Sequence, residues 1–578
     1  MLKRATTKGE GKQEAYMARP WGRSFWVPLL LLSLSLSLSL SLSLSLSPFG
    51  SDASNAYDGK RNASQFKGAV LQFSPLGDVS ANASSNVRRN LRGIYQALES
   101  LRRERHDIVV LPELVLYYVG LEEAHAKGKD ALREYAIELP DPDKETTNAC
   151  VGELPPDLHN VSFLRHLSCM ARALDVYLVA NVVDLVLSSS GEETFERNEA
   201  GNEVSDSYRL FNTDVVFDRR GTLVAKYWKW HTFGTAPLID QPTPLERKAV
   251  KFETDFGVTF GLAICFDIEF ENPAQKLLDQ GVRHFAFSSA WLNNPPFGFA
   301  TEIQQGWSKA TQAVLLAANI GTGPMNSGSG IYSMGKSLVS HFDINKFKGD
   351  NILMSAIIPR STEKTRLRQG PSSPSLQSGE ENLPLLQDDA REEHQTCLLD
   401  FIPQVTFNAS CSQLIGNKAE GANITLVEQN LRCEFSFVSL DPRRQNNGVP
   451  VAVAFSQLIH FPSTVDAVSY KGCILLMCVG YPKCSEDWSA LGKLGFAQIK
   501  SFLPNTSDRV IPLFSGMLKN GSTEHVVSRE VGSYTIDTES ERDTTIVQVS
   551  NRPDDQVQHT FNFGIISIRT SEDHSMYY

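Results

Sequence analysis

One thiol in this chain stands at the boundary between a strand pattern and a helix pattern. Residues 257–264 form an apolar, strand-like run that ends at Cys265, and Asn272 followed by Pro273 resembles the start of a helix. The carboxyl end of a strand is the edge at which open α/β sheets bind ligands. Free cysteines are also among the most buried residue types, so position alone leaves an inert core thiol as the alternative.

Two further charged groups occur at comparable positions. The apolar run of 107–113 ends in Glu113, and the hairpin pattern of 212–233 places Lys226 and Lys229 near its end. A carboxylate directly after a buried strand is unfavourable unless it is paired or takes part in chemistry. Taken singly, each of these residues is also explained by a solvated strand end.

Glutamate, lysine and cysteine at three strand ends can together perform nucleophilic catalysis. Glu113 can accept the proton of Cys265, whose thiolate is the competent nucleophile. Lys229 and the backbone N–H after Cys265 can stabilise the oxyanion that forms when the thiolate attacks an amide carbonyl. The pattern predicts a thioester intermediate, water activation by Glu113, and a lowered pKa for a working Cys265.

The elements that must position these groups follow an α/β pattern. Strand and helix patterns alternate through residues 57–358, which predicts an α/β domain. Residues 359–396 are polar and rich in serine, proline and charge, so we expect a linker there. Residues 397–578 carry short strand patterns between turn signals and are predicted to form a β-rich second domain. A chain of 578 residues is too long for a single core, which agrees with this division.

Residues 1–56 are predicted to be a secretory signal peptide and leader. A basic stretch precedes a leucine–serine alternation over 29–47, and the expected cleavage region is 51–59. Met17 begins a shorter signal and is an alternative start. A retained signal anchor is the other interpretation, since a membrane span needs about twenty predominantly apolar residues. The C-terminal residues lack the hydrophobic tail that signals a glycolipid anchor, so we expect no stable membrane anchor after cleavage.

The cysteine count also fits export. Eight of the nine cysteines form an even-numbered set suited to an oxidising compartment, and Cys265 is left unpaired. The sequence has no close CxxC pairs with nearby histidines and no nucleotide or flavin motif, so neither a metal nor a cofactor is predicted. The paired set is expected to comprise Cys150, Cys169, Cys397, Cys411, Cys433, Cys473, Cys478 and Cys484.

Surface chemistry gives two more expectations. The net charge of −11, without a basic cluster interleaved with aromatics, argues against nucleic-acid binding. Basic doublets such as Arg102–Arg103 and Arg219–Arg220 are interpreted as solvated faces. Asn-x-Ser/Thr acceptors predict glycosylation at Asn62, Asn82, Asn160, Asn408, Asn423, Asn505 and Asn520.

Three short segments resemble the signature sequences of the nitrilase, or carbon–nitrogen hydrolase, superfamily. They are LPE at 111–113, GTLVAKYWK at 221–229 and ICFD at 264–267. The phrases FNTDVVFDRRG, CFDIEFENPA, SSAWLNNPP, AANIGTG and GSGIYS resemble the vanin and biotinidase branch and follow its order. The resemblance covers 64–578 and is strongest over 208–335.

The resemblance implies a fold and roles for particular residues. The implied fold is a four-layer αββα sandwich over 57–358, followed by a β-rich, disulfide-containing C-terminal domain. Glu113 would be the general base, Lys229 the lysine that stabilises the intermediate, and Cys265 the nucleophile. Lys226 falls on a position that the family does not use for chemistry.

The sequence departs from the family pattern beside the expected site. Many members carry a second glutamate shortly after the lysine, but here Gly234 or Thr235 occupies that place and the next glutamate is Glu246. The aspartate that often follows the first glutamate in this branch is Leu114 here. Asp240 is a candidate pocket residue that would substitute in part, and its alternative is a loop acid.

The resemblance implies hydrolysis of a linear, non-peptide amide, so a small-molecule amide is the expected partner. Pantetheine, giving pantothenate and cysteamine, is preferred, and biocytin or biotinyl-peptides are the alternative. Trp291 is a candidate pocket wall, or else a core tryptophan that caps a strand. A secreted pseudoenzyme used as a binding module is the competing class. A cysteine protease is the weaker enzyme alternative, because neither His231 nor His284 has an identifiable orienting partner.

Overall fold

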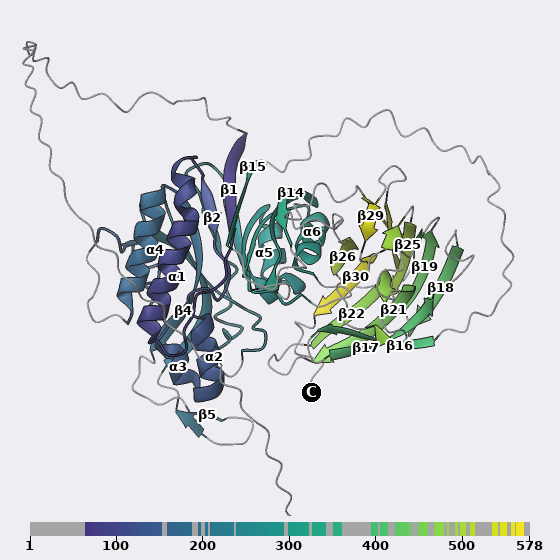
Figure 1. Cartoon of the computed structure of the whole chain (residues 1–578), viewed down its shortest axis with the longest axis horizontal. Coiled ribbons are helices and arrows are strands. Elements are labelled where there is room, and N and C mark those ends of the chain that lie inside the picture. The colour runs from purple at the N-terminus through teal and green to yellow at the C-terminus, as the bar shows by residue number, and fades with distance from the viewer. Residues whose placement is uncertain are drawn as a thin grey trace, which may run out of the picture. The chain divides into compact units, whose positions relative to one another are not determined.

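The computed structural model describes residues 64–360 and strands between 395 and 570, with gaps in both parts (Figure 1). The predicted signal segment 1–56 and most of the predicted linker 359–396 lie outside the described residues. None of the helices in the described ranges combines the length and apolarity needed to cross a membrane. The gaps in the first part are 153–158, 188–194, 198–202, 206–207, 236–237, 294–298, 323–325 and 343–350.

A mixed sheet is built from runs rich in β-branched residues, which favour the pleated backbone. Its order within the described residues is β15-β1-β2-β4-β7-β8-β3. The neighbours β1, β2 and β4 are parallel, whereas β7 and β8 form an antiparallel hairpin. The bounds are β1 Gln65–Gln72, β2 Ile108–Val110, β3 Thr147–Asn148, β4 Tyr177–Leu187, β7 Tyr208–Phe217, β8 Thr222–Trp228 and β15 Ile352–Pro359.

A second mixed sheet has the order β14-β13-β12-β11-β10-β9 in the described part of the chain. Its central strands β10, β11 and β12 are parallel, so their carboxyl ends meet at one edge. The bounds are β9 Lys251–Glu253, β10 Thr259–Ile264, β11 His284–Ser289, β12 Val314–Asn319, β13 Ser329–Ser333 and β14 Lys336–His341. A separate small hairpin pairs β5 Phe195–Arg197 with β6 Glu203–Ser205.

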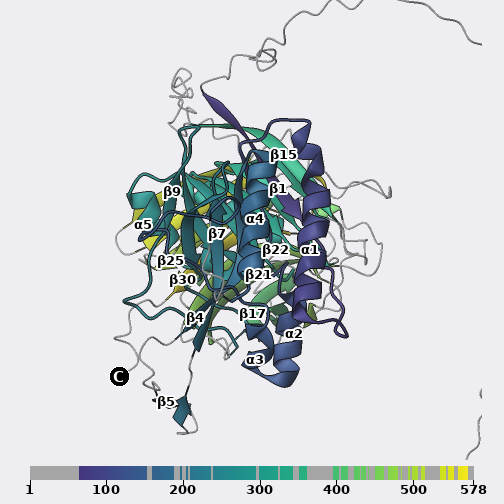
Figure 2. The same cartoon turned by 90° about the vertical axis from the view of Figure 1, so that its left-hand side faces the viewer.

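Two long helices, α1 Ala83–Leu98 and α4 Val161–Leu174, cover the outer face of the first sheet and lie side by side (Figures 1 and 2). Their apolar faces share one buried cluster with the strands, including Ile94, Leu167 and Val109. The shorter elements of this half are η1 Glu99–Arg102, α2 Tyr118–Lys127 and α3 Lys129–Arg133.

The two sheets pack face to face through a second cluster. It joins Val70 of β1 and Val179 of β4 to Leu262 of β10 and Leu316 of β12, all fully buried. Outside the second sheet lie η2 Cys265–Glu269, α5 Ala274–Asp279 and α6 Ala300–Thr311. The sequence of layers is therefore helix, sheet, sheet, helix, which confirms the αββα prediction.

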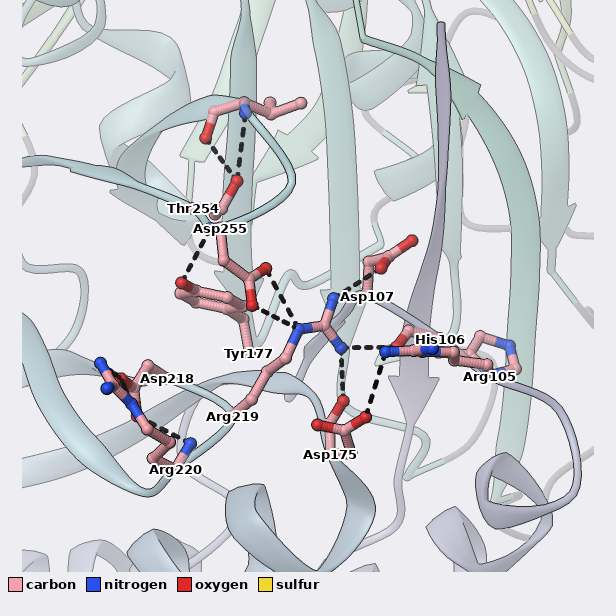
Figure 3. A network of polar contacts seen from close by, with 11 residues as sticks. Arg105, His106, Asp107, Asp175, Tyr177, Asp218, Arg219, Arg220, Thr254 and Asp255 are labelled. Atoms are coloured by element: carbon pink, nitrogen blue, oxygen red, sulfur yellow. Dashed lines mark hydrogen bonds and ion pairs between the residues drawn. The ribbon is translucent and has the colours of Figure 1, made fainter. Parts of the chain in front are cut away.

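The turn between β7 and β8 carries an arginine whose side chain is largely covered and joins several segments (Figure 3). Arg219 donates from Nε to both carboxylate oxygens of Asp255, at 3.0 and 3.1 Å, and from Nη2 to Asp107 at 2.5 Å. Its Nη1 donates to the carbonyls of His106 and Asp175. The side chain of Arg219 is only 8% exposed, so its assignment to a solvated face was wrong. The carboxylates that compensate the burial of Arg219 lie far from it in the sequence, so the local sequence could not reveal them.

The C-terminal part is β-rich, as predicted. Within the described residues its two larger sheets have the orders β23-β16-β17-β21-β22-β30-β26 and β18-β19-β25-β28-β27, and a small sheet has the order β20-β24-β29. The bounds are β16 Gln395–Ile402, β17 Val405–Gln413, β18 Ala422–Glu428, β19 Leu431–Phe437, β20 Leu440–Asp441, β21 Val449–His460, β22 Ala467–Cys478, β23 Lys483–Cys484, β24 Gly492–Leu494, β25 Ala497–Pro504, β26 Arg509–Phe514, β27 Tyr534–Glu541, β28 Thr544–Asn551, β29 Val557–Thr560 and β30 Asn562–Thr570.

The disulfides leave the expected thiol unpaired. Three bridges join Cys150 to Cys169, Cys397 to Cys411 and Cys433 to Cys473, and Cys478 is also disulfide-bonded. Among the described cysteines, Cys265 is free and buried. The prediction that Cys265 lacks a disulfide partner is confirmed.

Candidate active site

Three strand ends bring together the residues that the sequence singled out. Glu113 lies shortly after β2, Lys229 directly follows β8, and Cys265 directly follows β10. The Nζ atom of Lys229 lies 2.7 Å from Oε1 of Glu113, and both side chains are almost fully buried. Cys265, 8% exposed, is close enough to both that their charges act on its pKa. The arrangement is a buried ion pair beside a free thiol.

The backbone at Cys265 adopts a conformation that non-glycine residues rarely adopt. Its φ is 45°, in the left-handed region, where β10 turns directly into η2. Such a conformation costs roughly 1–2 kcal/mol for an L-residue. Strain of this kind persists where the surrounding structure holds it, and it often occurs at functional sites.

The electrostatics of the site keep the thiol neutral. Burial raises the pKa of Cys265 to about 12, and the Glu113 carboxylate adds to the rise. Lys229, the Ala290 N–H and the Ser289 hydroxyl oppose it without cancelling it. The expected lowering of the Cys265 pKa was therefore wrong, because burial and Glu113 outweigh the lysine. A neutral thiol needs a base to take its proton as it attacks.

The lysine remains a cation at this depth. Burial alone would lower the pKa of Lys229, but the charges of Glu113, Cys265 and Asp267 outweigh it and raise the pKa above its usual range. A fixed ammonium in a water-poor site can stabilise a developing oxyanion strongly.

Asp267 holds the lysine strand against the cysteine strand. Its Oδ2 accepts from the Tyr227 hydroxyl at 2.7 Å and from the Ile264 N–H at 3.0 Å, and its Oδ1 accepts from the His231 N–H at 3.0 Å. Tyr227 and His231 flank Lys229, and Ile264 precedes the thiol. Sequence reasoning gave Asp267 no role, although a carboxylate inside an apolar run was a usable signal.

Asn212 of β7 was also missed. Its Nδ2 donates to Oε1 of Glu113 at 2.7 Å, and its backbone carbonyl accepts from the Lys229 N–H at 2.9 Å. The other Glu113 oxygen accepts from the Ala290 N–H at 2.9 Å. An Asn-Thr-Asp run inside an apolar strand pattern was the available signal.

The two predicted pocket residues have different surroundings. Trp291 directly follows Ala290 and packs, partly buried, against the inter-sheet cluster that contains Cys265. Asp240 is ion-paired with Lys129 at 2.9 Å and accepts from the Leu210 N–H at 2.6 Å. Trp291 therefore shares a cluster with Cys265 and stays a predicted pocket wall, whereas the contacts of Asp240 hold a loop.

The departures from the family pattern leave the site without a second glutamate from this loop. Glu246 is held by Arg209 at 2.8 and 3.1 Å and by the Thr243 N–H at 2.9 Å. Gly234 has a φ of 65°, and Thr235 is buried. Neither residue offers a carboxylate in the place of the absent one.

The nearby histidines and lysine are engaged elsewhere. The His231 ring stacks on Phe270, with ring centroids 3.6 Å apart, and its Nε2 bonds the Asn272 carbonyl. His284 bonds the Pro359 carbonyl at 2.9 Å. Lys226 lies 3.1 Å from Asp184. The two histidines bond backbone carbonyls, so these contacts are not those of an imidazole paired with the Cys265 thiol.

The chain is similar to known proteins over the part that carries this site. Residues 69–340 match the carbon-nitrogen hydrolase family. Vanin-like protein 1 of Drosophila melanogaster is 31% identical over 307 residues, 53% of this chain and 48% of that protein. Biotinidase of Takifugu rubripes is 35% identical over 252 residues, 43% of this chain and 47% of that protein. Pantetheinase of Sus scrofa is 29% identical over 417 residues, 71% of this chain and 72% of that protein.

The likeness has a limited extent. The chain spans about half the length of several curated relatives that it matches. Among solved structures, that of Saccharomyces cerevisiae Nit3, a member of branch 10 of the nitrilase superfamily, is 17% identical with a TM-score of 0.37. The similarity covers 54% of this chain and 96% of that one.

Proposed function

Because residues 69–340 form a carbon-nitrogen hydrolase domain, we propose that the protein hydrolyses a linear, non-peptide amide through a thioester on Cys265. The observation that carries the proposal is the buried Glu113–Lys229 pair, 2.7 Å apart, beside a free thiol. A base, a cation and a nucleophile are the groups that acyl transfer from an amide needs.

In the first half-reaction, Glu113 takes the Cys265 proton while sulfur attacks the amide carbon. The electron pair of the carbonyl bond moves to oxygen, and the Lys229 ammonium stabilises that negative charge. When the C–N bond breaks, the protonated Glu113 returns its proton to the departing amine. The acyl group remains on sulfur as a thioester.

In the second half-reaction, Glu113 takes a proton from water, and the hydroxide oxygen attacks the thioester carbon. The C–S bond breaks, the proton returns to sulfur, and a carboxylic acid leaves. One water is consumed and one amine and one acid are formed, so the enzyme returns to its starting state.

Pantetheine is the amide that we propose first. The supporting observation is the extent of the match to Sus scrofa pantetheinase, 72% of that protein, which includes sequence beyond the hydrolase domain. The second candidate, a biotinyl amide, is supported by the higher identity of Takifugu rubripes biotinidase over a shorter stretch. Both substrates present a secondary amide bond to the thiol, and walls such as Trp291 would choose between their acyl parts.

Export into an oxidising compartment belongs to the same proposal. Bridges such as Cys150–Cys169 and Cys433–Cys473 are typical of secreted proteins. Expression of the full chain in cultured cells should place the protein in the medium, shortened by its leader. Retention of the intact chain on the cell surface would contradict secretion.

The activity is tested by incubating the purified protein with pantetheine or biocytin and measuring cysteamine, pantothenate and biotin. Release should disappear in Cys265→Ala and fall by roughly 100-fold or more in Glu113→Gln. Glu246→Gln, a change at the next glutamate after the lysine, is the matched control and should stay near the wild-type rate. If a folded protein with a free Cys265 cuts neither amide, the pseudoenzyme interpretation becomes the better one.

A further inference from the structure

Asn212 contacts both members of the ion pair. Its side-chain amide donates to Glu113 at 2.7 Å, and its main-chain carbonyl receives the Lys229 N–H at 2.9 Å. Asn212 is 3% exposed, so neither contact is shared with bulk water. A single residue therefore relates the carboxylate to the backbone that carries the ammonium.

The hydrogen bonds around Asn212 fix which way its amide points. The Leu114 N–H can only donate, so the Asn181 atom 3.1 Å from it must be the oxygen. The Asn181 nitrogen consequently faces Asn212, at 2.8 Å, and meets its oxygen. The Asn212 nitrogen is then the atom that faces Glu113. These hydrogen bonds run from the Leu114 N–H through Asn181 and Asn212 to the Glu113 carboxylate. Because Leu114 follows Glu113 in the chain, they close a ring.

Buried polar groups outside the ring hold it in place. The Tyr117 hydroxyl donates to the Asn181 oxygen at 2.9 Å, and Oδ1 of Asp214 accepts from the Asn181 nitrogen at 2.9 Å. Asn181 and Asp214 are fully buried, and Tyr117 is 1% exposed. Rotation of any one amide would leave a buried donor or acceptor unpaired, at roughly 1–3 kcal/mol each.

We propose that Asn212 is a positioning residue that fixes the Glu113 carboxylate for proton transfer with Cys265. The inference rests on the proposed function, because it gives Glu113 the role of base. Asn212 does not touch the reacting atoms and acts through Glu113. The titratable groups that face Glu113 are Lys229, Cys265, Asp214 and Tyr117.

The test uses the full chain and needs no amide substrate. The rate of Cys265 alkylation by iodoacetamide is measured against pH for the wild type, Asn212→Ala and Asn212→Asp. The matched control is Asn90→Ala, since Asn90 is another buried asparagine and bonds the backbone of Leu76. Melting temperatures are recorded for all four proteins.

Asn212→Ala should slow alkylation near pH 7 by roughly 10- to 100-fold, since a bond to a charged group is lost. In Asn212→Asp, the pH at which the alkylation rate increases should be higher by about one pH unit or more, because the variant places a second carboxylate against Glu113. Asn90→Ala should lower the melting temperature and leave the pH profile unchanged.

Wild-type rates and profiles in both Asn212 variants, with only the melting temperature reduced, would overturn the proposal. Asn212→Asp keeps the size of the side chain and the bond from Asn181, so it decides the matter even where Asn212→Ala does not fold. The result is also separable from the substrate assay. An altered profile in a protein that cuts neither pantetheine nor biocytin would uphold the positioning role and reject the proposed substrates.

Discussion

At the residue scale, Leu114 shows local strain beside Glu113. Its φ is 65°, and it takes the place of the aspartate that often follows this glutamate in the branch. Aspartate, asparagine and glycine tolerate the left-handed region better than leucine does. Because the Leu114 N–H starts the hydrogen-bonded ring, its backbone conformation is part of the site's geometry.

Leu114→Gly should be more stable than Leu114→Ala by about 1 kcal/mol, because both lose the side chain and only alanine keeps the strain. Urea denaturation of the two variants measures the difference. At Leu116, which is buried nearby, the usual order should hold and alanine should be the more stable. The same order at both positions would contradict strain at Leu114.

Asp214 is expected to be neutral in the folded protein. Burial raises its pKa well above the usual range, and the Glu113 charge adds to the rise. Asp214→Asn should therefore change the free energy of unfolding by less than about 1 kcal/mol at pH 7, since an amide resembles a protonated carboxyl. Asp218→Asn should cost more, because Oδ1 of Asp218 accepts two backbone N–H groups. Equal losses in thermal denaturation would refute a neutral Asp214.

At the element scale, the glycosylation acceptors differ in what their amides already do. Asn82 is exposed and caps α1 with its oxygen, which accepts from the Ser85 N–H at 2.9 Å. Asn160 precedes α4 and donates from Nδ2 to the carbonyls of Glu134 and Ala136, at 2.9 and 2.7 Å. A glycan is attached through this nitrogen, so it would disrupt the Asn160 contacts.

Glycopeptide mass spectrometry of secreted protein should find Asn82 modified and Asn160 unmodified. A fully occupied Asn160 would contradict this expectation. Asn408 is exposed on β17 and remains a predicted acceptor. Asn62, Asn505 and Asn520, and the side chain of Asn423, lie outside the described residues.

The sequence predicted those elements and site residues that local patterns define. Apolar runs located the strands that end near Glu113, Lys229 and Cys265. The odd number of cysteines indicated that one of them, Cys265, has no disulfide partner. The contacts of Asn212 and Arg219 could not be predicted in the same way. Their partners come from other segments, through strand register and sheet stacking, and one sequence without pairing information does not contain these.

At the scale of the whole molecule, the compact unit Arg61–Tyr578 contains both the αββα domain and the β-rich part. Phe455 and Ile474 of the C-terminal strands share a buried cluster with Leu277 of α5 and Trp307 of α6. The Tyr470 hydroxyl, from β22, donates to Glu269 in η2, the helix that Cys265 begins. The C-terminal sheet therefore directly contacts the short helix that begins at Cys265.

The burial of Glu269 at this contact predicts a pH-dependent stability. Burial raises the pKa of Glu269 from 4.5 to about 7, against the effect of the Tyr470 bond. The folded state thus binds a proton that the unfolded state releases between these values. The contribution of Glu269 to the free energy of unfolding is fully present below pH 4.5 and is lost as pH rises through about 7. This loss amounts to about 3 kcal/mol.

Denaturation midpoints measured from pH 4.5 to 8 should decline in the wild type and decline less steeply in Glu269→Gln, since buried groups such as Asp214 still titrate in the variant. Glu253→Gln, on the exposed surface of β9, is the matched control and should keep the wild-type slope. An unchanged slope in Glu269→Gln would show that another group titrates.

The left-handed backbone at Cys265 also bears on which residues should replace this cysteine during evolution. Under the proposed function, selection for catalysis would keep an L-residue with a reactive side chain at a position where glycine or asparagine would be less strained. In a lineage that abandons the reaction, that constraint disappears while the backbone preference persists. Relatives that have become binding proteins should therefore accumulate glycine or asparagine at this position first, before the strands that frame it diverge.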